Sequence, residues 1–215
     1  MNKKEIIKKT ISFARKKLEN GESGHDWQHT ERVQKMALKL AKEETADMFV
    51  VEMSALLHDV FDHKFFDEKL AQEKIKEFLE QFKLDKNIES HIESIVANIS
   101  FKGAKVKNQI STLEGKIAQD ADRLDAIGAI GIARVFSYGA HADRPFYDPK
   151  IKPVSHTSPE KYKNAKSTSI NHFYEKLLLL KNRMNTKTAK RIAKNRHEFM
   201  KKYLKQFFDE WEGKK

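Results

Sequence analysis

The chain has 215 residues, carries a formal net charge of +11 and has no cysteine. This length suits a single domain with a substantial core, and no apolar run reaches the roughly 18 residues of a membrane span. Without cysteine, disulfides and thiolate metal sites are excluded, and the N-terminus lacks the apolar run of a secretory signal. We therefore expect a cytoplasmic protein whose metal ligands, if it has any, are His and carboxylate.

Apolar residues recur at helical spacing from the N-terminus onward, and strand-like alternation is nearly absent. The first stripe runs from Ile7 to Leu18 and the second from Val33 to Ala41. Further stripes lie at residues 75–82, 88–99, 170–178 and 189–211. The sequence therefore predicts an all-α fold, a single helical bundle over residues 1–215 with a C-terminal pair of helices at 168–212.

Several helix boundaries are indicated by single residues. Asp26 precedes the second stripe and is predicted to be its N-cap. Ser111, with Glu114 three residues later, is typical of a capping box that opens a helix continuing into Asp122. Gly128 and Gly131 follow in the same helical region, where they weaken the helix or allow close packing.

All four prolines of the chain fall within residues 137–167. Irregular segments of this length are uncommon in compact domains and are usually functional or disordered. The segment also contains Arg144, Tyr147, Lys150 and His156. Two interpretations stay open: a lid over a ligand, or a surface excursion that takes part in a homodimer contact.

Positive charge is concentrated near the C-terminus. Between Lys181 and Lys205, ten Lys and Arg residues stand against one acid, Glu198. These basic residues recur at helical spacing opposite the apolar stripe, which is typical of a solvated helix face. A nucleic-acid partner is therefore the less favoured interpretation, since a basic face alone is only an electrostatic footprint.

Three short motifs place ionisable residues beside apolar ones. His29 lies in HDWQHTERV, the pair His58-Asp59 lies in LLHDVFDHKF, and Asp122 lies in QDADRLDAIGAIGIARVF. Charged groups next to a buried run have to be paired or bound to a metal. Two imidazoles and two carboxylates make a mixed nitrogen and oxygen site, which suits Mn²⁺, Fe²⁺, Co²⁺, Ni²⁺ or Zn²⁺ better than a calcium cage.

In this order the motifs resemble those of the HD-domain phosphohydrolase superfamily, which is named after a His-Asp doublet such as His58-Asp59. His29 stands at the position of the first histidine, and Asp122, in Ala-Asp-Arg-Leu, at that of the last ligand. Together with INHFYEKLLLLKNRM, the motifs are similar to a group of small stand-alone bacterial HD proteins, some of which are nucleotide pyrophosphohydrolases. The resemblance covers nearly the whole chain and implies a single HD domain with its metal-binding core at about residues 20–136.

The resemblance implies a metal-dependent phosphohydrolase acting on nucleotides. We expect manganese, with magnesium, iron, cobalt, nickel and zinc as alternatives. A divalent ion lowers the pKa of a bound water and polarises a phosphoryl oxygen. Asp62, one turn after His58, matches the acidic position that follows the doublet in the superfamily's alarmone hydrolases, and we expect it to act as general base or acid. The expected reaction converts (deoxy)nucleoside triphosphates to the monophosphate and pyrophosphate.

The rest of a triphosphate would need cations beyond the metal. Arginine is suited to this role because its planar fork matches phosphate geometry. We expect the substrate to be bound by four basic residues: Arg134, Arg144, Lys176 and Arg183.

Three further residues are candidates for the surroundings of the metal. His25, one turn before His29, is either an outer partner that orients it or only a residue of the helix start. His91, on an apolar face, is either a core histidine or one that lines the substrate side. Asp125 shares a helix face with Asp122 and is a candidate to hold a ligand or the sugar.

Other functions remain as alternatives. The same site would serve a nucleotide phosphodiesterase, a 5′-nucleotidase or an alarmone hydrolase. From another class, a basic helical nucleic-acid-binding protein would carry the metal only for structure. A small-molecule nucleotide is the expected partner, and no membrane is expected.

Overall fold

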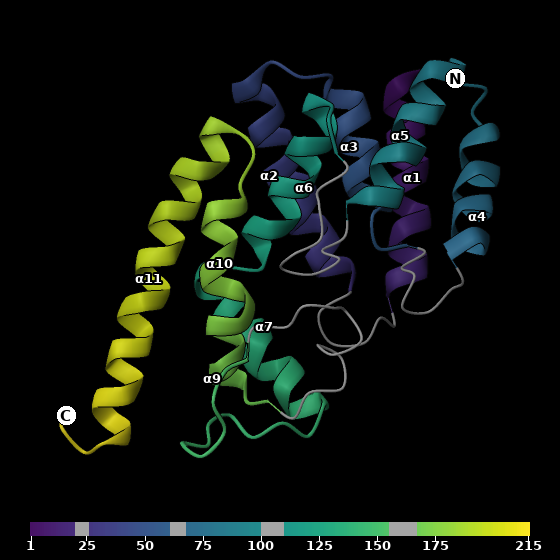
Figure 1. Ribbon diagram of the computed structural model, residues 1–215. Helices are drawn as coiled ribbons and strands as arrows, with labels where there is room; N and C mark the ends of the chain where they lie inside the picture. Colours follow the sequence, from purple (N-terminus) through teal and green to yellow (C-terminus); the bar gives the residue numbers. More distant parts are fainter. Residues whose placement is uncertain (20–25, 61–67, 100–109, 155–166) are drawn as a thin grey trace. The chain divides into compact units, whose positions relative to one another are not determined.

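The computed structural model describes residues 1–19, 26–60, 68–99, 110–154 and 167–215, and every structural statement below refers to these ranges. Within them the chain forms helices and turns and no strand, which confirms the predicted all-α fold (Figure 1). None of the described helices combines the length and the apolar character needed to cross a membrane.

Contacts group the described residues into two compact units. The first unit takes the described residues up to 99 together with 110–122, and the second takes those from 123 onward. The organisation of residues 1–215 as one domain stays a prediction.

Six helices make up the first unit, the last of which continues by three residues into the second. They are α1 (Lys3–Leu18), α2 (Trp27–Glu44), α3 (Met48–Leu57), α4 (Glu68–Glu80), α5 (Lys86–Asn98) and α6 (Leu113–Asp125).

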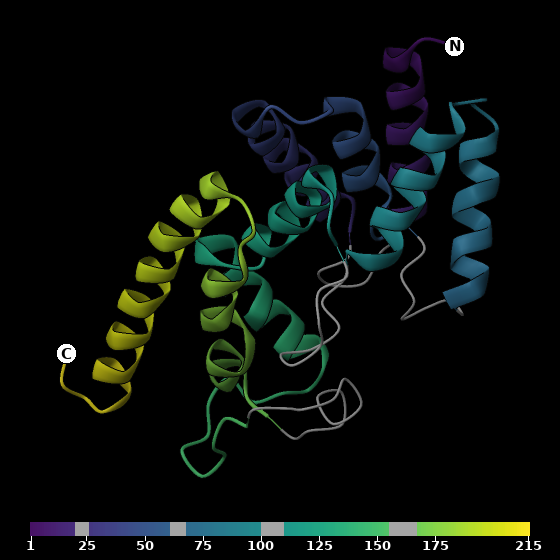
Figure 2. The same ribbon diagram turned by 45° about the horizontal axis from the view of Figure 1, so that its top comes forward.

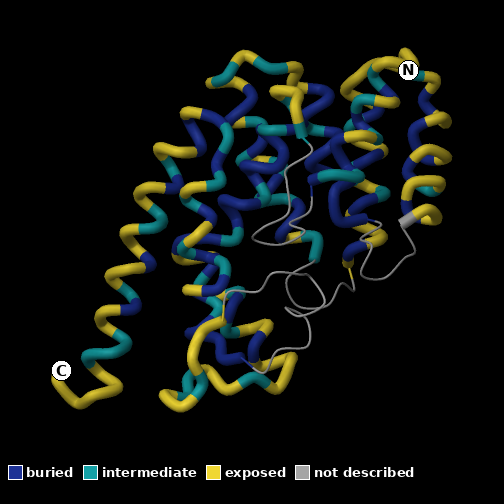
Figure 3. Tube along the Cα trace, viewed as in Figure 1, coloured by how far each residue is buried: buried dark blue, intermediate teal, exposed yellow. Residues whose placement is uncertain are grey.

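Helix α3 is the centre of the first unit. Eight of its ten residues are buried, and it is apolar on all sides rather than amphipathic (Figure 3). A helix of this kind has to be covered all round. Helices α1, α2 and α5 all pack against it. As a result, the residues that directly follow Leu57 are held in the interior of the unit.

The second unit contains α7 (Gly128–His141) and the C-terminal pair of helices. The first member of the pair covers residues 169–183 without a break, as α9 (Ser169–His172), the π-helix η1 (Phe173–Leu177), α10 (Leu178–Leu180) and the 3₁₀-helix η2 (Lys181–Arg183). The second member, α11 (Lys187–Trp211), packs alongside it and against α7 (Figure 2).

The region predicted as one helix through Asp122 and the glycines is two helices. Helix α6 ends at Asp125, and α7 begins at Gly128, whose φ of 81° is a left-handed conformation that favours glycine. At Gly131 a Cβ would lie 2.2 Å from the carbonyl oxygen of Ala126, so any side chain would clash there. The glycines therefore serve the tight connection between the helices.

The predicted capping box at the start of α6 is wrong. The hydroxyl of Thr112, not that of Ser111, accepts a hydrogen bond from the Gly115 N–H at 3.3 Å. The carboxylate of Glu114 instead accepts from the backbone N–H of Asp47, which precedes α3. The side chain of Glu114 therefore makes a tertiary hydrogen bond instead of capping its own helix.

The proline-rich segment is shorter than predicted at its N-terminal side, because α7 continues to His141. Residues 142–154 are then tied to the helix that follows. The N–H of Ser169 donates to the Pro145 carbonyl at 3.1 Å, that of Ile170 to Phe146 at 2.9 Å, and the Asn171 side chain to Ile151 at 2.9 Å. Residues 155–166 lie outside the described ranges.

Candidate metal centre

Four side chains of the first unit converge at the ends of three helices. They are His29 from the first turn of α2, His58 and Asp59 directly after α3, and Asp122 from α6. Nε2 of His29 lies 3.3 Å from Nε2 of His58, 3.4 Å from Oδ2 of Asp59 and 3.5 Å from Oδ1 of Asp122. Nε2 of His58 lies 3.4 Å and 4.0 Å from the same two carboxylate oxygens. The structure thus brings together all four predicted ligands.

His29 is held in place by the start of its own helix. Asp26 is the N-cap of α2, as predicted, and its Oδ1 accepts a hydrogen bond from the His29 N–H at 2.7 Å. The side chain of His29 is only 1% exposed. The cap therefore fixes the backbone from which this imidazole enters the cluster.

His58 is oriented by a backbone carbonyl. Its Nδ1 lies 2.8 Å from the carbonyl oxygen of Ala55, three residues earlier at the end of α3. A carbonyl accepts and does not donate, so Nδ1 of His58 carries a proton, and the other ring nitrogen, Nε2, faces the cluster. Metal-binding histidines commonly use a second-sphere acceptor in this way. Because this acceptor is a backbone carbonyl, no side chain in the sequence indicates it.

Asp122 carries its charge in this environment. Burial by itself raises the pKa of Asp122, but the hydrogen bond with His29 and the charges of His58 and His29 outweigh it, and the pKa falls from 3.8 to about 2. Its side chain is 27% exposed, whereas that of Asp59 is 6% exposed. Asp122 is therefore an ionised carboxylate on the open side of the cluster.

The donor set fits a divalent metal ion. Two atoms that share an ion at about 2.1 Å lie roughly 3.0–4.2 Å apart, depending on the angle between the bonds. The separations that involve the two imidazoles, 3.3–4.0 Å, fall in this range. Among the described residues, the ligand atoms of His29, His58 and Asp59 all lie within 4.8 Å of one another, a group that does not include Asp122. Two nitrogens and two carboxylates favour a borderline transition ion, in line with the expectation from sequence.

Two of the predicted site residues lie outside the described ranges, namely Asp62, the expected general base or acid, and His25. A third, His91, lies against the start of α6. Its Nε2 is 2.9 Å from Oγ1 of Thr112 and 4.0 Å from Oε2 of Glu114. Because ten residues of α6, about 15 Å of helix, separate Thr112 from Asp122, this position does not favour a role beside the metal.

Asp125 and Arg134 are engaged with each other. Nη1 of Arg134 donates to Oδ2 of Asp125 at 2.6 Å, and the Asp125 side chain is only 6% exposed. This differs from the roles expected from sequence, a ligand or sugar contact for Asp125 and a phosphate contact for Arg134. The pair instead joins the end of α6 to α7 within the second unit, and this favours a structural role for both.

The other three expected substrate residues also belong to the second unit. The Arg144 guanidinium lies 5.5 Å from the centre of the Tyr138 ring. Lys176 lies in η1, and the backbone carbonyl of Arg183 accepts a hydrogen bond from Arg123. Their contact with substrate stays a prediction.

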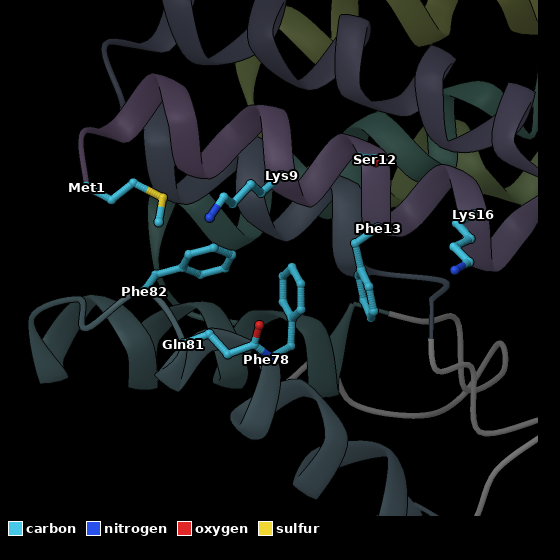
Figure 4. A pocket seen from close by; sticks show the side chains of 8 residues that line it. All are labelled: Met1, Lys9, Ser12, Phe13, Lys16, Phe78, Gln81 and Phe82. Atoms are coloured by element: carbon cyan, nitrogen blue, oxygen red, sulfur yellow. The ribbon is translucent and has the colours of Figure 1, made fainter.

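A separate groove of about 430 Å³ lies in the first unit between α1 and α4 (Figure 4). Its floor is aromatic, with the rings of Phe13 and Phe78 stacked at 4.1 Å. Lys9 and Lys16 stand at its edge, and none of the four metal-ligand candidates lines it. Phe78 and Phe82 are each more than nine-tenths buried, so the groove presents little free ring surface.

Comparison with known proteins identifies the family of this chain. The model of the HD domain family matches residues 26–127, a range that contains all four clustered side chains. YpgQ from Bacillus subtilis is 37% identical over 186 residues, which cover 86% of this chain and 83% of that protein.

Solved structures agree with the sequence comparison. A Lactobacillus plantarum protein superimposes with a TM-score of 0.87 at 38% identity, over 99% of this chain and 100% of that one. An HD-superfamily hydrolase from Bacillus thuringiensis gives a TM-score of 0.79 at 43% identity, over 98% and 99% of the two chains. The structure of YpgQ in complex with ADP gives 0.76 at 33% identity, over 95% and 97%.

Proposed function

We propose that this chain, which belongs to the HD domain family and is a metal-dependent phosphohydrolase, acts on nucleotides. The proposed reaction hydrolyses nucleoside and deoxynucleoside triphosphates to the monophosphate and pyrophosphate. The observation that carries the phosphohydrolase assignment is that the two imidazoles lie 3.3 Å apart, with one oxygen of each of two carboxylates 3.4–4.0 Å from both. The nucleotide is supported by the ADP complex of YpgQ, a relative of this chain.

We propose that His29, His58, Asp59 and Asp122 hold the metal. When bound there, a divalent ion lowers the pKa of a water molecule and polarises a phosphoryl oxygen. The chain's own contribution is to fix the ligands before the ion arrives. Asp26 holds the backbone of His29, and the Ala55 carbonyl holds the ring of His58 through its Nδ1–H. Manganese is the ion we propose first.

In the proposed reaction, the oxygen of water forms a bond to the α-phosphorus while the bond from that phosphorus to the bridging oxygen of the β-phosphate breaks. Pyrophosphate leaves with the electron pair. Asp62 is proposed to accept the proton of the attacking water, and its position one turn after His58 in sequence supports this role. Arg144, Lys176 and Arg183 are proposed to neutralise the remaining phosphates.

The test is hydrolysis of a nucleotide panel in ¹⁸O-labelled water with several divalent metals. Label in the monophosphate, with pyrophosphate as the co-product, is expected. Release of inorganic phosphate from monophosphates, with triphosphates untouched, would indicate the 5′-nucleotidase instead. Turnover of cyclic nucleotides or of alarmones alone would indicate the other two enzymatic alternatives.

Family membership favours an enzyme over the alternative of a nucleic-acid-binding protein with a structural metal. The basic residues of α11 are consistent with this. Its buried face is formed by Thr188, Ala189, Ala193, Met200 and Leu204, while Lys190, Lys194, Lys201 and Lys205 are exposed on the remaining surface. A cytoplasmic location and a homodimer stay predictions.

A further inference from the structure

The proposed metal site and the second unit share one helix, α6. Asp122, the last of the four proposed ligands, lies in the final turn of this helix. The three residues that end the helix, Arg123, Leu124 and Asp125, already belong to the second unit. The carbonyl groups at the end of a helix have no partner within it, so contacts from elsewhere decide whether the last turn is held or frays.

Two of these three residues are tied to other elements of the second unit through their side chains. The Asp125 carboxylate accepts a hydrogen bond from Nη1 of Arg134 in α7 at 2.6 Å. The Arg123 guanidinium donates to the backbone carbonyl of Arg183 in η2. The end of α6 is therefore attached at two points to the elements that follow it.

Arg196 of α11 makes a third contact, and this one is to the backbone of the turn. Its Nη1 donates to the Leu124 carbonyl at 2.5 Å, and the same oxygen also accepts from the Ile127 N–H at 3.2 Å. Leu124 follows Asp122 by two residues, which is about 3 Å of helix. Arg196 thus acts on the course of the helix backbone directly beside the ligand, rather than on a side chain.

The connection between α6 and α7 leaves room for Arg196. A Cβ on Gly128 would lie 3.0 Å from Cγ and 3.1 Å from Cβ of Arg196, so the stem of the arginine lies directly on the glycine backbone. Burial lowers the pKa of Arg196, and the charge of Asp125 opposes this. An arginine stays charged in proteins, and a charged donor makes a stronger hydrogen bond to a carbonyl than a neutral one.

Asp122 is the proposed ligand with the least packing around its side chain. It is 27% exposed, whereas the side chains of His29, His58 and Asp59 are 1–6% exposed. Groups that orient a ligand from outside the coordination sphere commonly change metal affinity by 10–100-fold. The direction in which Asp122 reaches the ion therefore depends strongly on how the last turn of α6 is held.

We propose that Arg196 is a positioning residue for the metal: by holding the Leu124 carbonyl, it fixes the last turn of α6 and with it the metal ligand Asp122. This inference rests on the proposed function, because it takes Asp122 as a ligand. Arg196 itself touches neither metal nor substrate. We expect an effect at the lower end of the usual range, about tenfold in metal affinity, because it is transmitted through the backbone.

The experiment is calorimetric titration of the metal-free full chain with Mn²⁺, without nucleotide. Arg196→Met keeps an apolar stem against Gly128 and removes the donor, so the Kd for Mn²⁺ is expected to rise about tenfold. Should this variant not fold, Arg196→Gln takes its place with the same expected rise. Arg196→Lys keeps a cationic donor and is expected to recover most of the affinity. Lys194→Gln removes an exposed cation of the same helix and is the matched control, with an unchanged Kd.

Leu204→Ala separates positioning from a general loosening of α11. Leu204 is 5% exposed and lies eight residues after Arg196, about 12 Å along the helix. Its truncation leaves a cavity and is expected to lower the Tm at least as much as Arg196→Met does. We expect the Kd for Mn²⁺ to stay at the wild-type value. An equal rise of the Kd in Leu204→Ala and Arg196→Met would overturn the proposal.

A double-variant cycle shows whether Arg196 acts through Asp122. Asp122→Ala is expected to raise the Kd more than Arg196→Met, and combining the two should add nothing, because the ligand that Arg196 positions is gone. Additive effects, or a wild-type Kd in Arg196→Met, would overturn the proposal and leave the proposed site standing.

Failure of the proposed function gives a different pattern. A wild-type Kd in Asp122→Ala would remove Asp122 from the metal site, and would overturn both that site and the role of Arg196. A failure of nucleotide hydrolysis alone would not alter any of these titrations, since they contain no substrate.

Discussion

The Nε2 atoms of His29 and His58 lie 3.3 Å apart, and each is 3.4 Å from the same oxygen of Asp59. Because the Ala55 carbonyl accepts a hydrogen bond from the Nδ1–H of His58, the other ring nitrogen, Nε2, is the one that faces His29 and Asp59. Such an arrangement is poised to accept a cation, either a proton shared between the rings or a metal ion.

Removing one of these ligands should release the metal. His58→Ala or Asp59→Ala takes away one of four ligands and leaves the remaining buried groups without their shared ion. We expect elemental analysis of the purified variants to show little bound metal, and turnover to be lost. His141→Ala, at an exposed position at the end of α7, is the control and should keep its metal. Full metal content in both ligand variants would refute the site.

Changing Asp62 should affect rate without affecting metal. Asp62→Asn preserves the size of the side chain and removes its ability to take up a proton. If it manages the proton of the attacking water, kcat is expected to fall by roughly 10²–10⁴. Asp143→Asn removes an exposed carboxylate at a positive φ that Asn tolerates, and should behave as wild type. A normal rate in Asp62→Asn would assign this residue to structure.

The metal-free protein should lose stability in acid through Asp122. Its pKa is about 2 in the folded chain against 3.8 as an ordinary value. A lowered carboxyl pKa contributes stability above the unfolded value, and this is lost as the pH falls from about 4 towards 2. The contribution is about 2 kcal/mol. Urea unfolding of chelator-treated protein should show it, and Asp122→Asn should lack this part of the pH dependence. Parallel curves for the two proteins would contradict the prediction.

Arg134 should matter for stability more than for substrate. Its partner Asp125 is 6% exposed, so Arg134→Gln removes a hydrogen bond to a buried charge. We expect the free energy of unfolding to fall by about 1.5–3 kcal/mol. A double-mutant cycle with Asp125→Asn measures the coupling. The exposed pair Lys35–Glu31 is the comparison, with a coupling of about 0.5 kcal/mol or less. If Arg134→Gln instead raises KM and leaves the free energy of unfolding unchanged, Arg134 binds substrate and the structural role is wrong.

The sequence by itself determined the helical class and the chemistry of the cluster. The 3.6-residue period of apolar positions is a local property, and it correctly predicted helices where the structure has α1, α2, α5 and α11. The N-cap at Asp26 could also be predicted, because it needs only the Asp26 side chain and the backbone N–H of His29, three residues later. The identities of the four candidate ligands followed from their motifs.

Only the tertiary structure decided which groups meet. The acceptor that orients His58 is the backbone carbonyl of Ala55, which no side chain in the sequence indicates. Glu114 does not form the predicted cap and instead accepts from the backbone N–H of Asp47, 67 residues away. Hydrogen bonds between the start of α9 and residues 145–146 join two segments that no pattern in the sequence pairs. Spacing along a chain fixes neighbours within a helix, whereas contacts between segments depend on how whole helices pack, and no local pattern records that.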